Sequence, residues 1–149
     1  MQREFPVAPL MGVGAVIIDQ DRVLLVQRGN EPMKGHWSLP GGLLELGESL
    51  TEGVQREVRE ETGLIVEVLE LVELLDRIFR QDERVRYHYV IADYLCRVVG
   101  GDLKANSDAD AVRWISRGEW STINTQFDSV MRRVIEAAWQ RLQKEGPQG

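Results

Sequence analysis

Four glutamates, placed around one short predicted helix, are the side chains of this sequence best suited to chemistry. Glu57, Glu60 and Glu61 stand at i, i+3 and i+4, so they share one face of a helix, and Glu48 precedes that helix. Like charges this close repel by a few tenths of a kcal/mol per pair, and the last turn before Gly63 disfavours anions through the helix dipole. A helix selected for stability alone would avoid this arrangement. A helix that holds a divalent cation needs it, because hard cations such as Mg²⁺ bind carboxylate oxygens.

The ends of this helix are also recognisable in the sequence. Ser49 is a candidate N-cap, and Glu52 stands three residues later, which is the capping-box arrangement. The helix is expected to run to about Thr62, with Gly63 as its C-cap. Gly42, in the preceding segment, suits a turn. Such turns would aim the carboxylates.

Strands and one further helix are predicted around this segment, and a mixed sheet with helices on its faces is their natural packing. Alternation of apolar residues and turn signals predict strands, the first two forming a hairpin and the fourth and fifth a strand pair with a bend. These strands cover 12–18, 23–28, 37–39, 64–75, 78–80, 87–99 and 112–115. Helical spacing predicts a C-terminal amphipathic helix. Its apolar residues are Phe127, Val130, Met131, Val134, Ile135, Ala138 and Leu142.

The chemistry-bearing residues fall into one longer pattern, Gly-x5-Glu-x7-Arg-Glu-U-x-Glu-Glu-x-Gly-U, where U is a bulky aliphatic residue. The chain meets this pattern at every specified position from Gly42 to Leu64. It closely resembles the signature of the Nudix hydrolases, and the resemblance extends over roughly 12–120. The resemblance implies an α/β fold, an α/β/α sandwich with a mixed β-sheet and flanking helices. The helix alone would suggest a solvated charged face, but the complete spacing favours a metal site.

The resemblance implies roles for the acidic residues. In the family, glutamates matching Glu57, Glu60 and Glu61 bind Mg²⁺ or Mn²⁺, and a backbone carbonyl matching Gly41 often completes the ligand set. The residue matching Glu57 is a ligand in some members and the base that orients water in others. The sequence leaves open which of these applies.

Two further residues of the signature are expected to support the site. The arginine matching Arg56 usually holds a signature glutamate in position, often the one matching Glu48. Arg56 also stands one turn before Glu60, so an ordinary surface ion pair is the simpler reading of that pair alone. Glu48 is expected to support the metal ligands and to share in binding the metal in some states.

Candidate substrate contacts outside the signature rest on weaker signals. Arg28 ends a predicted strand and could bind a phosphate bidentately, although a solvated strand end is equally compatible. Asp108 and Asp110 precede the last strand, where the family often places an acidic residue for contact with metal or nucleobase. A plain turn aspartate is the alternative. His88 is expected to be structural, and aromatic residues that could stack on a base more often fill the core. These aromatics are Trp37, Phe79, Tyr87 and Trp114.

Composition sets the outer bounds. The 149 residues fit a single domain, 1–149, with an extended arm at 1–9 and a frayed tail at 144–149. A net charge of −6, from 18 Lys and Arg against 24 Asp and Glu, argues against binding to nucleic acid or to an anionic membrane. The single cysteine, Cys96, excludes an internal disulfide and is expected to be a buried thiol. Without a signal peptide or a membrane-length apolar run, a cytoplasmic location is expected.

The function implied by the resemblance is Mg²⁺-dependent hydrolysis of a phosphoanhydride bond in a nucleoside diphosphate linked to another moiety. The segments flanking the signature look most like those of enzymes that act on ADP-ribose or a related nucleotide sugar, giving AMP and a sugar phosphate. A MutT-type enzyme that removes oxidised or non-standard nucleoside triphosphates is the alternative. A non-catalytic, nucleotide-sensing Nudix module is a third possibility. The expected partner is a small nucleotide, and a homodimer is left open.

Overall fold

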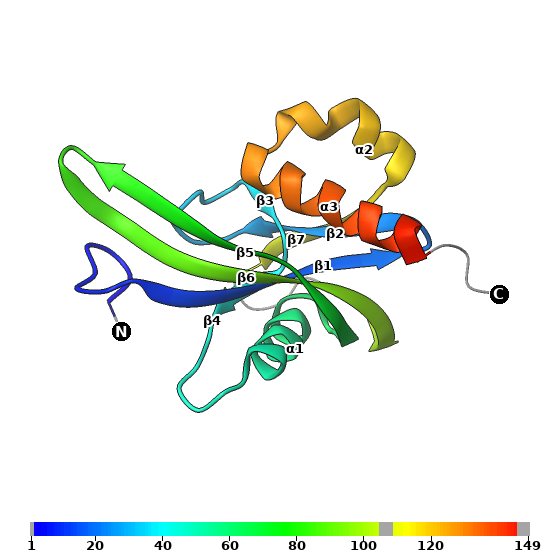
Figure 1. The fold of residues 1–149 in the computed structure, drawn as a ribbon, viewed down its shortest axis with the longest axis horizontal. Helices are drawn as coiled ribbons and strands as arrows, with labels where there is room; N and C mark the ends of the chain where they lie inside the picture. Colours follow the sequence, from blue (N-terminus) through cyan, green and yellow to red (C-terminus); the bar gives the residue numbers. More distant parts are fainter. Residues whose placement is uncertain (1, 105–108, 146–149) are drawn as a thin grey trace.

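The computed structural model describes residues 2–104 and 109–145 and contains a seven-stranded mixed sheet flanked by helices (Figure 1). The strands run in the order β3-β2-β1-β6-β5, with β4 paired to β1 and β7 paired to β2. The elements are β1 (Leu10–Asp19), β2 (Arg22–Arg28), β3 (Trp37–Ser38), β4 (Gly41–Leu43), α1 (Leu50–Thr62), β5 (Leu64–Gln81), β6 (Arg84–Gly101), β7 (Ala109–Ser116), α2 (Arg117–Ile123), a 3₁₀ turn (Asn124–Gln126) and α3 (Ser129–Glu145). The predicted mixed sheet with flanking helices is confirmed.

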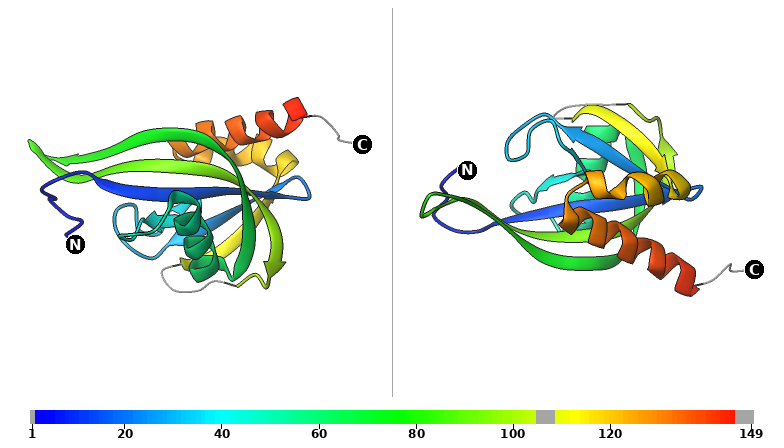
Figure 2. Two further views of the ribbon diagram at one scale, coloured as in Figure 1. Left: turned by 60° about the horizontal axis from the view of Figure 1, so that its bottom comes forward. Right: turned by 90° about the horizontal axis from the view of Figure 1, so that it is seen from above.

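Strand β1 organises the fold. It pairs in parallel with β6 and antiparallel with β4, whereas its pairing with β2 is confined to two positions near the turn. Strand β2 then diverges from β1 and pairs with β3 and β7. Helix α1 lies on one side of the strands, and α2 and α3 lie on the other (Figures 1 and 2).

The core has two parts, one on each side of β1. Val13, Ala15 and Ile17 pack toward α1, whereas Val16 packs in the cluster that includes α3 residues. This division follows from the two-residue period of a strand, which sends successive side chains to opposite faces. The α1 side contains Val54 and Val58, and the α3 side contains Trp120, Val134, Ile135 and Trp139.

The expected strand pair at 64–75 and 78–80 is wrong, because β5 is one continuous strand, Leu64–Gln81. Its pairing with β6 shifts register at several positions, including Val68/Glu70 and Leu71/Glu73. Such bulges change the face to which later side chains point without ending the strand. The interrupted alternation in the sequence therefore reflects bulges.

Two elements were missed, and one helix begins later than expected. Strand β4 and helix α2 were not predicted, and α3 begins at Ser129, so Phe127 precedes that helix. Helix α3 also includes residues 144 and 145, so any frayed tail lies beyond the described residues. The N-terminal arm contains no helix or strand from 2 to 9 and is tied to β6 by a 2.7 Å hydrogen bond from the Phe5 N–H to the Arg86 carbonyl.

Two smaller expectations concern Cys96 and membrane-spanning segments. Cys96 is buried as predicted, and this burial raises the pKa of its thiol to about 12. Among the described residues, no helix has the length and apolar character required to cross a membrane.

Candidate active site

Helix α1 is fixed at both ends. The Glu52 N–H donates to the Ser49 hydroxyl at 3.2 Å, and the Ser49 N–H donates to the Glu52 carboxylate at 3.1 Å, which confirms the capping box. At the other end, Gly63 has a φ of 78° and donates its N–H to the Arg59 carbonyl. A side chain at Gly63 would overlap the Asp102 carbonyl, so glycine is required there for both φ and space.

Arg56 joins the acidic residues of the signature. Its guanidinium holds Glu48 bidentately, with N–O distances of 2.6 and 3.0 Å. It also donates to Glu57 at 2.8 Å, to Glu60 at 3.2 Å and to the Leu43 carbonyl at 3.0 Å. The expected pairing of Arg56 with Glu48 is therefore present. The hydrogen bond with Glu48 raises the pKa of Arg56, and the same bond lowers the pKa of Glu48.

Two carboxylates of α1 lie against the glycines of β4. The Gly41 N–H donates to Glu61 Oε1 at 2.7 Å, and the Glu61 side chain is buried. A Cβ on Gly42 would lie 2.5 Å from Cδ of Glu57, so only glycine allows this close approach. Strand β4 thus presents bare backbone to Glu57 and Glu61.

These residues suit a hard divalent cation by their chemistry, because the available donors are carboxylate and backbone oxygens. Over 2–104 and 109–145, however, no three His, Cys, Asp or Glu side chains are gathered closely enough to hold a metal ion. Glu60, with a 48% exposed side chain, is held by Arg56 at 3.2 Å. A third carboxylate ligand would require rotation of the exposed Glu60 side chain, which costs little.

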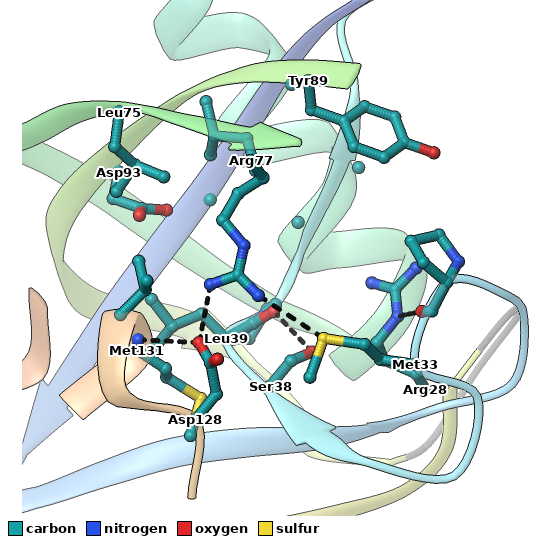
Figure 3. Close-up of a pocket in the computed structure, with 18 of the residues that line it drawn as sticks. Arg28, Met33, Ser38, Leu39, Leu75, Arg77, Tyr89, Asp93, Asp128 and Met131 are labelled. Carbon is teal, nitrogen blue, oxygen red and sulfur yellow. Dashed lines mark hydrogen bonds and ion pairs between the residues drawn. The ribbon is translucent and has the colours of Figure 1, made fainter. Parts of the chain in front are cut away.

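A cavity of about 170 Å³ lies beside β4 (Figure 3). Gly41 and Gly42 line it, so the glycines that meet the α1 carboxylates also form its wall. Its charged lining residues are Arg3, Arg28, Arg77, Asp93 and Asp128, and its aromatic ones are His36, Trp37, Phe79 and Tyr89. Open space for a ligand therefore adjoins the acidic helix.

The family model for the NUDIX domain matches residues 8–138. The chain belongs to the Nudix family. An ADP-ribose pyrophosphatase of Methanocaldococcus jannaschii is 40% identical over 101 residues, 68% of this chain and 58% of that protein. An 8-oxo-dGDP phosphatase of Mus musculus is 35% identical over 112 residues, 72% of this chain and 32% of that protein. The chain thus spans just over half of the archaeal relative and about a third of the mouse relative.

Solved Nudix structures share the fold. The NUDIX domain of Shewanella oneidensis NrtR, crystallised with ADP ribose, has a TM-score of 0.72 and 27% identity. The comparison covers 91% of this chain and 90% of that one.

An ion pair crosses the cavity of this Nudix domain (Figure 3). Arg77 extends from β5 and donates to Asp128 Oδ2 at 2.6 Å, and that oxygen also accepts from the Met131 N–H at 3.1 Å. Partial burial, the largest single effect, opposes ionisation of Asp128, but the hydrogen bonds from Arg77 and from backbone N–H groups, together with attraction to Arg77, outweigh it and lower the pKa. Sequence reasoning missed both residues. An aspartate just before the apolar spacing of α3 was the available signal, since aspartate favours helix N-termini.

Asp93 is the buried acid of the cavity. It lies opposite Gly14 in the β1–β6 pairing, is only 6% exposed, and its Oδ1 occupies the space that a Cβ on Gly14 would need. Its carboxylate has no hydrogen bond or ion pair with any other described residue. Burial raises the pKa of Asp93 to about 7; repulsion from Glu73 adds to this effect and attraction to Arg77 opposes it. Sequence reasoning missed Asp93 too, since a single acid within a strand carries no periodic signal.

The other predicted substrate contacts have mixed outcomes. Arg28 lines the cavity, and its Nε donates to the Pro32 carbonyl at 2.7 Å. Asp108 lies outside the described residues, and Asp110 is placed only as backbone in β7. Of the predicted aromatics, Trp37 and Phe79 line the cavity. Tyr89, which was not singled out for a ligand, lines it as well.

Proposed function

We propose that the protein hydrolyses a phosphoanhydride bond in a nucleoside diphosphate linked to another moiety, with Mg²⁺ or Mn²⁺ as cofactor. The substrate proposed is ADP-ribose or a related nucleotide sugar, cleaved to AMP and a sugar phosphate. The observation that carries this proposal is the complete set of signature glutamates, two of which lie against a glycine strand that also walls a cavity. The names of the archaeal relative and of the ADP-ribose complex support the substrate.

Glu57, Glu60, Glu61 and the Gly41 backbone would hold the cation. When bound, such a cation neutralises charge that develops on the phosphates and lowers the pKa of a water. Glu57 is held by Arg56 and Glu61 by the Gly41 N–H, so their oxygens are oriented before any ligand arrives. Such preorganisation lowers the cost of assembling the site.

The remaining signature residues act through position. Arg56 binds Glu48, Glu57 and the Leu43 carbonyl together, and so keeps α1 and the segment before it in register.

Arg28, at the cavity wall, is proposed to bind a substrate phosphate, because a guanidinium can donate two parallel hydrogen bonds to phosphate oxygens. Asp108 stays a proposed substrate contact.

A second candidate is hydrolysis of oxidised or non-standard nucleotides, supported by the mouse relative named as an 8-oxo-dGDP phosphatase. A nucleotide-sensing module without catalysis is disfavoured by the intact acidic set, since closely spaced glutamates are costly to a helix that has no use for them. Assembly as a homodimer stays a prediction.

Product analysis tests these alternatives. The purified chain is incubated with Mg²⁺ and ADP-ribose, other nucleotide sugars, diadenosine polyphosphates, NADH, 8-oxo-dGDP or 8-oxo-dGTP, and the products are separated by chromatography. AMP and ribose 5-phosphate, formed only with the metal and lost in Glu61→Gln, would support the ADP-ribose proposal. Glu136→Gln, which changes an exposed glutamate of α3, is the matched control. Faster release of a nucleoside monophosphate from the 8-oxo substrates would favour the second candidate, and no turnover of any substrate would overturn both.

A further inference from the structure

Asp93 is a buried carboxylate that lines the cavity and does not stabilise the fold. Its side chain is 6% exposed and lines the cavity next to Arg77 (Figure 3). Its neighbours on the same face of β6, Ile91 and Leu95, are apolar. An apolar side chain at 93 would continue this surface at no electrostatic cost.

The fold offers Asp93 no compensating partner among the described residues. Buried carboxylates are normally paired or hydrogen-bonded, because desolvation of an unpaired one is expensive. Arg77, the cation that attracts Asp93, is already bound to Asp128 and contacts the Met33 sulfur. Burial and repulsion from Glu73 raise the pKa of Asp93 to about 7, and attraction to Arg77 offsets them only in part. A ligand in the cavity could supply the partner that the fold does not provide.

The chemistry of the cavity restricts that ligand. An ionised carboxylate only accepts hydrogen bonds, so a ligand of the ionised form presents N–H or O–H donors to it. Apolar and aromatic side chains also line the cavity, with Trp37, Phe79, Ile91 and Met131 among them. Such side chains can pack against the faces of a planar heterocycle.

The position of Asp93 relative to the acidic helix also suits a nucleotide. Asp93 pairs with Gly14 on β1, and Gly14 pairs with Gly41 on β4, whose N–H is bound by Glu61. Two strand spacings thus separate the backbone at 93 from the backbone at 41, roughly 10 Å. A nucleoside monophosphate with its base at Asp93 would therefore carry its phosphate toward β4.

We propose that Asp93 is a specificity-determining residue, which accepts hydrogen bonds from the N–H donors of a nucleobase held in this cavity. The ligand class is a nucleotide whose base carries an exocyclic amine or a ring N–H, such as adenine or guanine. This inference rests on the proposed function only in taking the substrate to be a nucleotide.

Equilibrium binding to the full chain without added metal tests the proposal. The probes are AMP, GMP, purine riboside 5′-monophosphate, which lacks the donors, and ribose 5-phosphate, which lacks the base. We expect AMP or GMP to bind the parent protein at least about tenfold more tightly than purine riboside monophosphate. Equal affinities for these probes, or tight binding of ribose 5-phosphate alone, would overturn the assignment of Asp93 to a base.

Variants locate the effect at Asp93. Asp93→Leu keeps the shape of the side chain and removes the acceptor, so the preference for amino bases should disappear. Asp93→Asn keeps one acceptor and adds a donor, so it should weaken GMP, which offers two adjacent donors, more than AMP. Glu136→Gln changes an exposed residue of α3 outside the cavity lining, and should keep the parent preference. A preference retained in Asp93→Leu would contradict the proposal.

These outcomes are separable from those that test hydrolysis. Binding discrimination without turnover would leave Asp93 as a base-recognition residue and remove the proposed activity. Turnover of a nucleotide without any discrimination between bases at Asp93 would support the proposed hydrolysis and remove the assignment of Asp93 to base recognition.

Discussion

Glu61 on α1 accepts a 2.7 Å hydrogen bond from the backbone N–H of Gly41 on β4, 20 residues earlier in the chain. Strand β4 pairs only with β1 among the described strands, so its outer N–H groups lack a sheet partner. Glu61 satisfies one of these donors and ties α1 to the wall of the cavity. The same side chain therefore serves the fold and, in our proposal, the metal.

Glu61→Gln should separate these two roles. Glutamine keeps an oxygen that can accept from Gly41 but lacks the charge that a divalent cation requires. We expect hydrolysis to fall by at least about 10²-fold, with a melting temperature close to that of the parent. Steady-state kinetics and thermal unfolding measure the two effects. Near-parental activity would rule out Glu61 as a metal ligand.

Arg56→Ala should destabilise the protein as well as inactivate it. Arg56 is only 20% exposed and pairs with both Glu48 and Glu57, so its loss removes a positive charge from this acidic cluster. Loss of one partner from such a network costs about 3 kcal/mol when it is fully buried, and somewhat less at this exposure. Urea unfolding should show a decrease of about 2 kcal/mol.

Arg59→Ala is the matched control for this variant, since Arg59 lies in the last turn of the same helix. Its loss should change the free energy of unfolding by less than about 1 kcal/mol. Equal effects of the two substitutions would mean that Arg56 contributes only as a surface charge.

Gly42→Ala should impair catalysis through Glu57. The added Cβ would lie 2.5 Å from Cδ of Glu57, so the carboxylate must move away from β4. We expect a lower kcat, by about tenfold or more, because small displacements of positioned groups are costly to catalysis. Gly118→Ala, where a Cβ meets no atom within 4 Å, should leave kcat unchanged. A fully active Gly42→Ala variant would show that Glu57 does not need its present position.

The signature region could be predicted from sequence because its determinants are local. The capping box of Ser49 and Glu52, the C-cap at Gly63 and the shared face of the glutamates depend on spacings of a few residues. The cavity depends on long-range pairing. Arg77 meets Asp128 51 residues away, and Asp93 faces the cavity only because of its register with β1. Bulges in β5 also break the alternation from which strand faces are read.

Asp93→Asn should change how stability depends on pH. Burial raises the pKa of Asp93 from 3.8 to about 7, with repulsion from Glu73 adding to this and Arg77 opposing it. Between these two values the native state binds more protons than the unfolded state, so the free energy of unfolding of the parent falls as pH rises. A shift of this size corresponds to an upper limit of about 4 kcal/mol.

Asparagine carries no charge and lacks this contribution. The difference in unfolding free energy, Asp93→Asn minus parent, should therefore be small near pH 4 and favour the variant increasingly up to pH 8. Urea unfolding across this range measures it, with Glu136→Gln as an exposed control that should show no such trend. A difference that is independent of pH would mean that Asp93 is not buried as a carboxylate in the native state.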